Sequence, residues 1–217
     1  MTKSKYYPAI DEEPDMSSIT ASIRSEYERY RALGEGAIAQ LSDTEICQPA
    51  SDYNNDGASG NSVAIIVWHL SGNLASRFTD FLNTDGEKPW RRRDEEFLSR
   101  TATKAAVLEK WQHGWTILFD ALNGLTDADL ARVVTIRSKP LLVVEALHRS
   151  LAHVSFHIGQ IVLLAKTMRG ASWKFLSIPP NGSAAYNANP TFERPSVHAD
   201  ILRGKKADDA EESKPKI

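Results

Sequence analysis

Four long stretches of this sequence repeat apolar residues at three- and four-residue steps, the spacing of one face of an α-helix. We predict helices over residues 17–41, 61–82, 101–122 and 138–169. The Ser138-Lys139-Pro140 run resembles a helix start, since a hydroxyl cap and an early proline commonly begin helices. No stretch shows a convincing strand pattern. The sequence therefore predicts an all-α protein, and four such helices favour a four-helix bundle.

Two long irregular segments separate these helices, at residues 42–60 and 84–99. Long connections of this kind are often functional, and they favour a bundle with extended crossing loops over a plain hairpin bundle. Gly34 and Gly36 interrupt the first helix and could allow a neighbour or a ligand to approach closely. We expect a polar N-terminal segment over residues 1–16, one domain over 17–179 and an irregular, disordered C-terminal tail over 180–217.

The composition excludes several classes of protein. The sequence has 26 Lys and Arg against 28 Asp and Glu, and a formal charge of −2 provides no basic surface for nucleic acid or an anionic membrane. The N-terminus does not resemble a signal peptide, and no apolar run approaches the roughly 20 residues of a membrane span. We therefore expect a cytoplasmic protein. A single cysteine, Cys47, cannot form an internal disulfide or a thiolate zinc cluster, so a transition metal would need histidine and carboxylate ligands.

Three of the six histidines could form a metal site. His153 and His157 are four residues apart on a predicted helix, about 6 Å along its axis and about 40° around it, so both rings could reach one ion. His69 would add a third ring from another helix. Three histidines leave a coordination position for water or substrate, as in catalytic zinc sites. The alternative is that these histidines are structural and satisfied by local hydrogen bonds, since pairs at this spacing are common.

The other histidines fit metal binding less well. Glu145 and His148 form one Glu-x-x-His element, but a ferritin-like di-iron site needs two such elements and two further carboxylates. No second element exists in the sequence. His113 lies in a Trp-flanked helical segment and His198 lies in the predicted tail, so neither is an expected ligand.

Two separated motifs together resemble the DinB/YfiT-like superfamily. They are VWHLSGN around His69 and HVSFHIGQI over residues 153–161, and the stretches TDGEKPWRRRDEEF and WKFLSIP resemble an uncharacterised branch described as a domain of unknown function. The resemblance spans about residues 17–179. It implies an up-down-down-up four-helix bundle that is often dimeric. It also implies a divalent ion, zinc or nickel, held by His69, His153 and His157, although some members have lost their metal.

The resemblance also suggests a function. Characterised relatives include thiol-dependent S-transferases and a maleylpyruvate isomerase. The expected function is therefore a metal-dependent S-transferase, in which the metal activates a low-molecular-weight thiol, or a hydrolase, acting on a small-molecule substrate. The alternative is a non-enzymatic helical bundle, a binding or stress-associated protein with an unoccupied or structural histidine site.

Further polar residues could support such a site. Asn73 and Gln160 each follow a predicted ligand by about one helical turn and could orient a ligand or bind substrate. Beside Trp90, three consecutive arginines could grip an anionic cofactor: Arg91, Arg92 and Arg93. The more common alternative is a solvated charge run answered by the acidic residues at 94–96. No carboxylate adjoins the histidine motifs as a general base, which favours thiol activation over hydrolysis.

Overall fold

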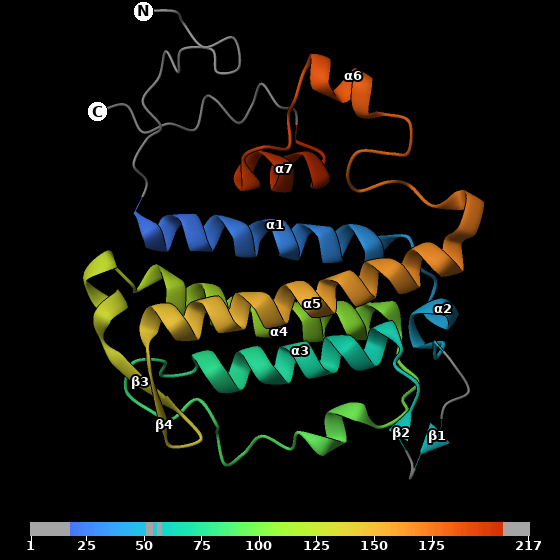
Figure 1. Ribbon diagram of the computed structural model, residues 1–217. Helices are drawn as coiled ribbons and strands as arrows, with labels where there is room; N and C mark the ends of the chain where they lie inside the picture. The colour runs from blue at the N-terminus through green and yellow to red at the C-terminus, as the bar shows by residue number, and fades with distance from the viewer. Residues whose placement is uncertain (1–17, 51–53, 56–57, 206–217) are drawn as a thin grey trace, which may run out of the picture.

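The computed structural model describes residues 18–50, 54–55 and 58–205, and this part of the chain is mainly helical, as predicted. Four long helices lie side by side (Figure 1): α1 (Ile19–Ala39), α3 (Val63–Phe78), α4 (Lys104–Asn123) and α5 (Val143–Arg169). Helix α3 packs against α4 and α5, and α1 packs against α5 and α4. Among the described residues, no helix has both the length and the hydrophobicity that crossing a membrane requires.

The apolar faces of these four helices form the core. Trp115 and Tyr27 are among its largest fully buried side chains, and the Tyr27 hydroxyl donates to the Leu147 carbonyl at 3.0 Å. Gly34 lies against the indole of Trp111, and a Cβ atom at this position would collide with that ring. The predicted close approach of a neighbour at Gly34 is therefore confirmed, and the neighbour is a side chain of α4.

Short elements occupy the predicted irregular segments. The first segment contains α2 (Asp43–Cys47) and two paired two-residue strands, β1 (Asn54–Asn55) and β2 (Ala58–Ser59). The second contains the 3-10 helix η1 (Asp94–Phe97), which packs against α3. A further 3-10 helix, η2 (Asp127–Ala131), follows α4. Both irregular segments thus pack against the long helices, and the segment over residues 84–99 reaches the candidate site.

The prediction that the last long helix begins at Ser138-Lys139-Pro140 is wrong. These residues belong to a β-hairpin of β3 (Val133–Ile136) and β4 (Lys139–Leu142), which pair antiparallel, and α5 begins only at Val143. The two residues of the turn, Arg137 and Ser138, have φ values of 54° and 60°, as a type I′ hairpin turn requires. Proline is compatible with a strand of this kind because the two-stranded ribbon consists only of edges.

A distant carboxylate stabilises this turn. Asp85 accepts hydrogen bonds from the backbone N–H groups of Arg137 at 2.8 Å and Ser138 at 2.7 Å. The backbone N–H of Gly86 donates to the Thr135 carbonyl at 2.8 Å, which joins the loop after α3 to strand β3. The local sequence resembles a helix start, but contacts made more than 50 residues away specify a hairpin.

The predicted irregular tail is also wrong for part of its length. The 3-10 helix η3 (Gly170–Ser172) follows α5, and two helices lie beyond residue 180: α6 (Ser183–Ala188) and α7 (Pro195–Leu202). Helix α7 packs on α1, above it in Figure 1. His198 of α7 is buried, and its Nε2 donates to the Leu176 carbonyl at 2.9 Å. The predicted polar segment 1–16 and the end of the predicted tail, residues 206–217, lie outside the described residues.

Candidate metal site and adjoining pocket

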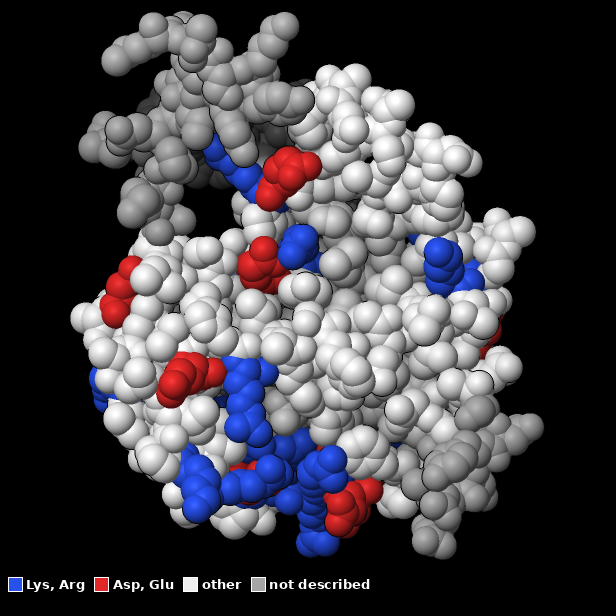
Figure 2. Space-filling model, viewed as in Figure 1, with Lys and Arg blue, Asp and Glu red and all other residues white. Residues whose placement is uncertain are grey.

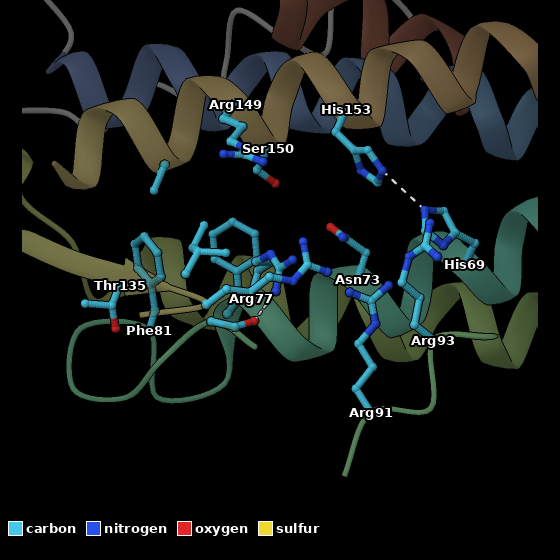
Figure 3. Close-up of a pocket in the computed structure, with 15 residues that line it drawn as sticks. His69, Asn73, Arg77, Phe81, Arg91, Arg93, Thr135, Arg149, Ser150 and His153 are labelled. Atoms are coloured by element: carbon cyan, nitrogen blue, oxygen red, sulfur yellow. Dashed lines mark hydrogen bonds between the residues drawn. The ribbon is translucent and has the colours of Figure 1, made fainter. Parts of the chain in front are cut away.

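Three histidine side chains meet between α3 and α5. His69 lies on α3, and His153 and His157 lie one turn apart on α5. The Nε2 atom of His153 is 3.3 Å from His69 Nε2, the contact marked in Figure 3, and 3.2 Å from His157 Nε2. One ligand atom of each ring lies within 4.8 Å of the other two. The structure thus brings the three predicted residues together, and they could hold a metal ion.

A buried carboxylate sets the proton position on His69. Glu96 of η1 lies 2.9 Å from His69 Nδ1 and also forms a two-pronged ion pair with Arg91, with both N–O distances 2.8 Å. Burial raises the pKa of Glu96, but the hydrogen bonds and charges of Arg91 and His69 outweigh it and bring the pKa below its usual range. An ionised carboxylate only accepts hydrogen bonds, so His69 Nδ1 carries a proton, and Nε2 is the ring nitrogen that can present a lone pair to an ion.

Glycine at position 72 makes room for this carboxylate. Gly72 lies one turn beyond His69 on α3, and a Cβ atom there would collide with the Glu96 carboxylate. The VWHLSGN motif therefore carries both a histidine and the space for the group that orients it. Carboxylates that accept from the second nitrogen of a metal-binding histidine are common, because they fix the tautomer and the ring orientation.

The other two rings complete the donor set. His157 Nδ1 lies 2.7 Å from the Gln160 side-chain oxygen, so this nitrogen donates and Nε2 again presents a lone pair. The pKa of His153 is lowered to about 3, mainly by burial and then by nearby charges, so this ring is neutral at pH 7. These charges belong to His157, His69, Arg91 and Arg77. Burial is also the main reason that the pKa of His157 is lowered.

This arrangement fits a cation better than a hydrogen-bonded cluster. Two nitrogens bound to one tetrahedral zinc ion at about 2.0–2.1 Å lie roughly 3.3–3.4 Å apart, close to the two separations of 3.3 Å and 3.2 Å measured from His153 Nε2. A proton on His153 Nε2 could form a hydrogen bond with only one of the two neighbouring Nε2 atoms, those of His69 and His157. The other Nε2 atom would then face His153 without a hydrogen bond. Nδ1 of His153 is buried and has no hydrogen-bond partner among the described residues, whichever nitrogen carries the proton.

A cavity of about 210 Å³ adjoins the histidines. His69 and His153 line one end of it, and Asn73 of α3 lies between them and the rest of the pocket (Figure 3). Phe78 and Phe81 contribute an apolar wall, and no Asp or Glu is among the described residues that line the cavity. Five arginines line it: Arg77, Arg91, Arg93, Arg137 and Arg149. Figure 2 shows Lys and Arg side chains gathered on this face, below α5.

The three consecutive arginines differ in their environments. The side chain of Arg91 is only 2% exposed and is held by Glu96, whereas that of Arg92 is 78% exposed and pairs with Glu95. Arg93 lies over the Phe97 ring, which itself packs against His69, and it lines the cavity. Arg92 is therefore part of a solvated charge run, as the alternative interpretation expected. Arg91 and Arg93 lie beside the candidate site, as the other interpretation expected.

The remaining predicted positions are also resolved. Asn73 lines the cavity, Gln160 contacts His157, and His113 and His148 are exposed and outside the three-histidine cluster. Sequence reasoning missed Glu96 as a partner of His69, and it missed three of the pocket arginines: Arg77, Arg137 and Arg149. Arg77 lies eight residues after His69 on the same helix, a spacing that could have indicated it. The hairpin and loop residues carry no such local signal.

Comparison with known proteins gives one family. No curated protein and no solved structure matches the chain. A family model matches residues 16–182, which include all three histidines, Glu96 and the pocket arginines. The match covers most of the sequence, and the chain belongs to the family described as Protein of unknown function (DUF1572).

Proposed function

We propose that this protein is a metal-dependent enzyme that acts on a small molecule in the arginine-lined cavity, with His69, His153 and His157 as metal ligands. The observation that carries the proposal is the convergence of three Nε2 atoms beside a cavity open to a ligand. Three imidazole ligands suit zinc or nickel, which histidine binds well. The resemblance to the DinB/YfiT-like superfamily supports the same ligand set.

The residues of the site favour an S-transferase over a hydrolase. A bound divalent ion would supply a Lewis acid that lowers the pKa of a thiol or water at the open position. A hydrolase also commonly uses a carboxylate base, but the described lining of the cavity has none, and Glu96 is committed to Arg91 and His69. A low-molecular-weight thiol would bring its own nucleophile. Asn73 lies where its amide could hydrogen-bond such a co-substrate.

We extend the proposal to topology and assembly. The contacts of α1 with α4 and α5, and of α3 with the same two helices, suit the up-down-down-up bundle of that superfamily. Members of it are often dimers, and α5 exposes Phe156 and Leu163 at 63% and 64% of their surface, which would suit a homodimer. Sedimentation at micromolar concentration tests this, and a monomeric mass would count against the dimer.

Elemental analysis of protein purified without a nickel column tests the metal site. We expect near-stoichiometric zinc or nickel in the wild type and its loss in His153→Ala. A thiol-transfer screen with metal-loaded protein, several low-molecular-weight thiols and electrophilic acceptors then tests the reaction, with the three histidine variants as controls. A site that stays empty after incubation with zinc and nickel would contradict the proposal and favour the alternative, a non-enzymatic binding or stress-associated bundle.

A further inference from the structure

We propose that the cavity beside the three histidines is a binding site for a small dianion, either a dicarboxylate or a phosphate monoester. The inference shares the cavity of the proposed function but does not depend on the proposed metal. It specifies the class of substrate or co-substrate, and arginine side chains carry it independently of any metal.

The first argument is the local balance of charge. Glu87 forms ion pairs with both Arg77 and Arg137, at N–O distances of 3.2 Å and 3.0 Å, and Glu96 forms one with Arg91. Asp94 lies 3.6 Å from Arg93 and is fully exposed, so this ion pair is weak.

The fifth arginine, Arg149, has no ion-pair partner among the described residues. Asp85 does not line the cavity, and the neighbouring Lys88 balances its negative charge. Five guanidinium groups thus face three carboxylates, which leaves a surplus of two positive charges. A ligand with two negative charges would balance it.

The second argument is the placement of the arginines. They come from four separate elements: Arg77 from α3, Arg91 and Arg93 from the loop before η1, Arg137 from the hairpin turn and Arg149 from α5. In Figure 3, the labelled arginines of α3 and the loop approach the cavity from below, and Arg149 lies above it on α5. Guanidinium groups on opposite sides of a cavity suit an anion with charge at two positions, because each guanidinium is a positive charge with several N–H donors.

The third argument is rigidity. Arg77 donates to the Gly86 carbonyl and to Glu87, and Arg91 is held by two hydrogen bonds to Glu96. Arginines that are already ordered lose less side-chain entropy when they bind a ligand. Surface arginines that serve only solubility do not require such supports, and Arg92, which does not line the cavity, has only an exposed pair with Glu95.

The size and lining of the cavity limit the ligand further. About 210 Å³ is below the usual range of roughly 300–1,000 Å³ for the pockets of drug-sized ligands, so the cavity suits a smaller ligand. Phe78 and Phe81 offer an apolar wall for a short carbon skeleton. These features together indicate a compact molecule with a few carbons between or beside its charged groups.

Isothermal titration calorimetry of the full chain at low ionic strength tests the proposal. The probes are succinate, glutarate and inorganic phosphate as anions of higher charge, acetate as a monoanion and succinamide as a neutral analogue. We expect the first group to bind at least tenfold more tightly than acetate, and succinamide not to bind. Tighter binding of the dicarboxylates would assign carboxylate chemistry, and tighter binding of phosphate would assign phosphate chemistry.

Matched variants separate the cavity from general surface charge. Arg149→Gln and Arg77→Gln should each weaken dianion binding about tenfold or more, because each removes a positive charge and its charge-assisted hydrogen bonds to the ligand. Arg149 is exposed on α5, so we expect Arg149→Gln to fold. This variant therefore still tests the proposal if Arg77→Gln fails to fold. Arg92→Gln removes the same charge outside the cavity and should leave binding unchanged. Equal weakening by Arg92→Gln and Arg149→Gln, or no preference for dianions over acetate, would overturn the proposal.

One further variant distinguishes this inference from the metal proposal. His157 is a candidate ligand that is not among the residues lining the cavity. His157→Ala should therefore abolish metal binding and retain dianion binding. Loss of dianion binding in this variant would show that the anion depends on the ion and would contradict the arginine site. An empty metal site in the wild type, combined with tight dianion binding, would contradict only the metal proposal.

Discussion

The two ends of the candidate site are built in different ways. At one end, three histidines lie on α3 and α5, and two of them are one turn apart on the same helix. At the other end, Arg91, Arg93 and Arg137 lie on a loop and a hairpin turn, and only Arg77 and Arg149 lie on helices. The histidine end can be inferred from local spacing, whereas the arginine end depends on contacts between distant parts of the chain.

This difference separates two requirements of the proposed metal-dependent enzyme. A metal site needs ligand atoms held to within a few tenths of an ångström, and rigid helices provide that precision. A substrate pocket can be shaped by loops, which change more readily than the helices that support them. The two ends meet at Glu96 and Arg91, where one ion pair touches both a histidine and the cavity. Substitutions at and around this junction should therefore show how strongly the two ends are coupled.

The largest effect is expected from the histidine end alone. His153→Ala and His157→Ala each remove one of three proposed ligands, so bound metal should fall from near one equivalent per chain to near zero. Arg149→Gln, at the other end, should retain the full equivalent. Inductively coupled plasma mass spectrometry of the three variants provides the comparison. Metal retained by both histidine variants would show that the ion, if present, binds elsewhere.

Glu96→Gln should affect both ends. It leaves Arg91 buried without its counter-charge, and removing one partner of a buried pair costs roughly 3 kcal/mol or more of unfolding free energy. It also weakens the support of His69, so metal affinity should fall about 10- to 100-fold. Urea denaturation and a competitive metal titration measure the two effects. Glu95→Gln, which alters an exposed neighbouring pair, is the control and should change neither quantity.

Gly72→Ala tests the same junction through space instead of charge. The added methyl group would displace the Glu96 carboxylate, and overpacking of this kind costs about 1–3 kcal/mol, offset in part by the better helix propensity of alanine. We expect a modest loss of stability together with weaker metal binding. Gly159→Ala is the matched control, because its methyl group meets nothing within 4 Å and should stabilise α5 by about 0.5–1 kcal/mol. Unchanged metal affinity in Gly72→Ala would mean that Glu96 does not orient His69.

The smallest expected effect lies at the arginine end. Hydrogen bonds from the backbone N–H groups of Glu87, Ser138 and Arg137 hold the pKa of Asp85 well below its usual range. A lowered folded-state pKa contributes stability above the unfolded value of about 3.9, and this contribution is lost as the pH falls toward the folded value. Asp85→Asn should therefore lower the melting temperature at pH 7, and its difference from the wild type should narrow below about pH 4.

Thermal melts of the wild type and Asp85→Asn between pH 7 and pH 3 measure this narrowing. Asp120→Asn, on the exposed side of α4, provides the control and should follow the wild type. The metal content of Asp85→Asn should remain that of the wild type, since the hairpin turn does not contact the histidines. A parallel loss of metal would show that the two ends of the site are less independent than their construction indicates.

The sequence predicted the helical frame because period and capping are local properties. The apolar steps over residues 61–82 and 101–122 place α3 and α4 within a few residues of their ends. It failed at the Ser138-Lys139-Pro140 run, where a cap and a proline are equally compatible with a turn and an edge strand. The interaction that decides between them is the bond network of Asp85, which no local pattern reveals.

The candidate site shows the same division. The spacing of His153 and His157, joined to His69 through the motif resemblance, identified the cluster that the structure brings together. Glu96 could not be identified, because it stands in a run of acidic residues that are otherwise exposed. Its burial depends on the missing side chain at Gly72 and on the ion pair with Arg91. Three adjacent arginines have three different environments because their side chains meet Glu96, Glu95 and Phe97, and composition cannot show which partner each one has.

The packing of α7 on α1 has a practical consequence for where this protein can be cut. The family match ends at residue 182, but α7 covers α1, with Ala199 fully buried and His198 bound to the Leu176 carbonyl. A chain shortened to the family boundary would expose apolar surface on α1 to water and remove a buried hydrogen-bond donor. Such a truncation should melt earlier and associate more readily than a chain ending after residue 205. We therefore expect the unit that unfolds cooperatively to extend beyond the residues that the family model matches.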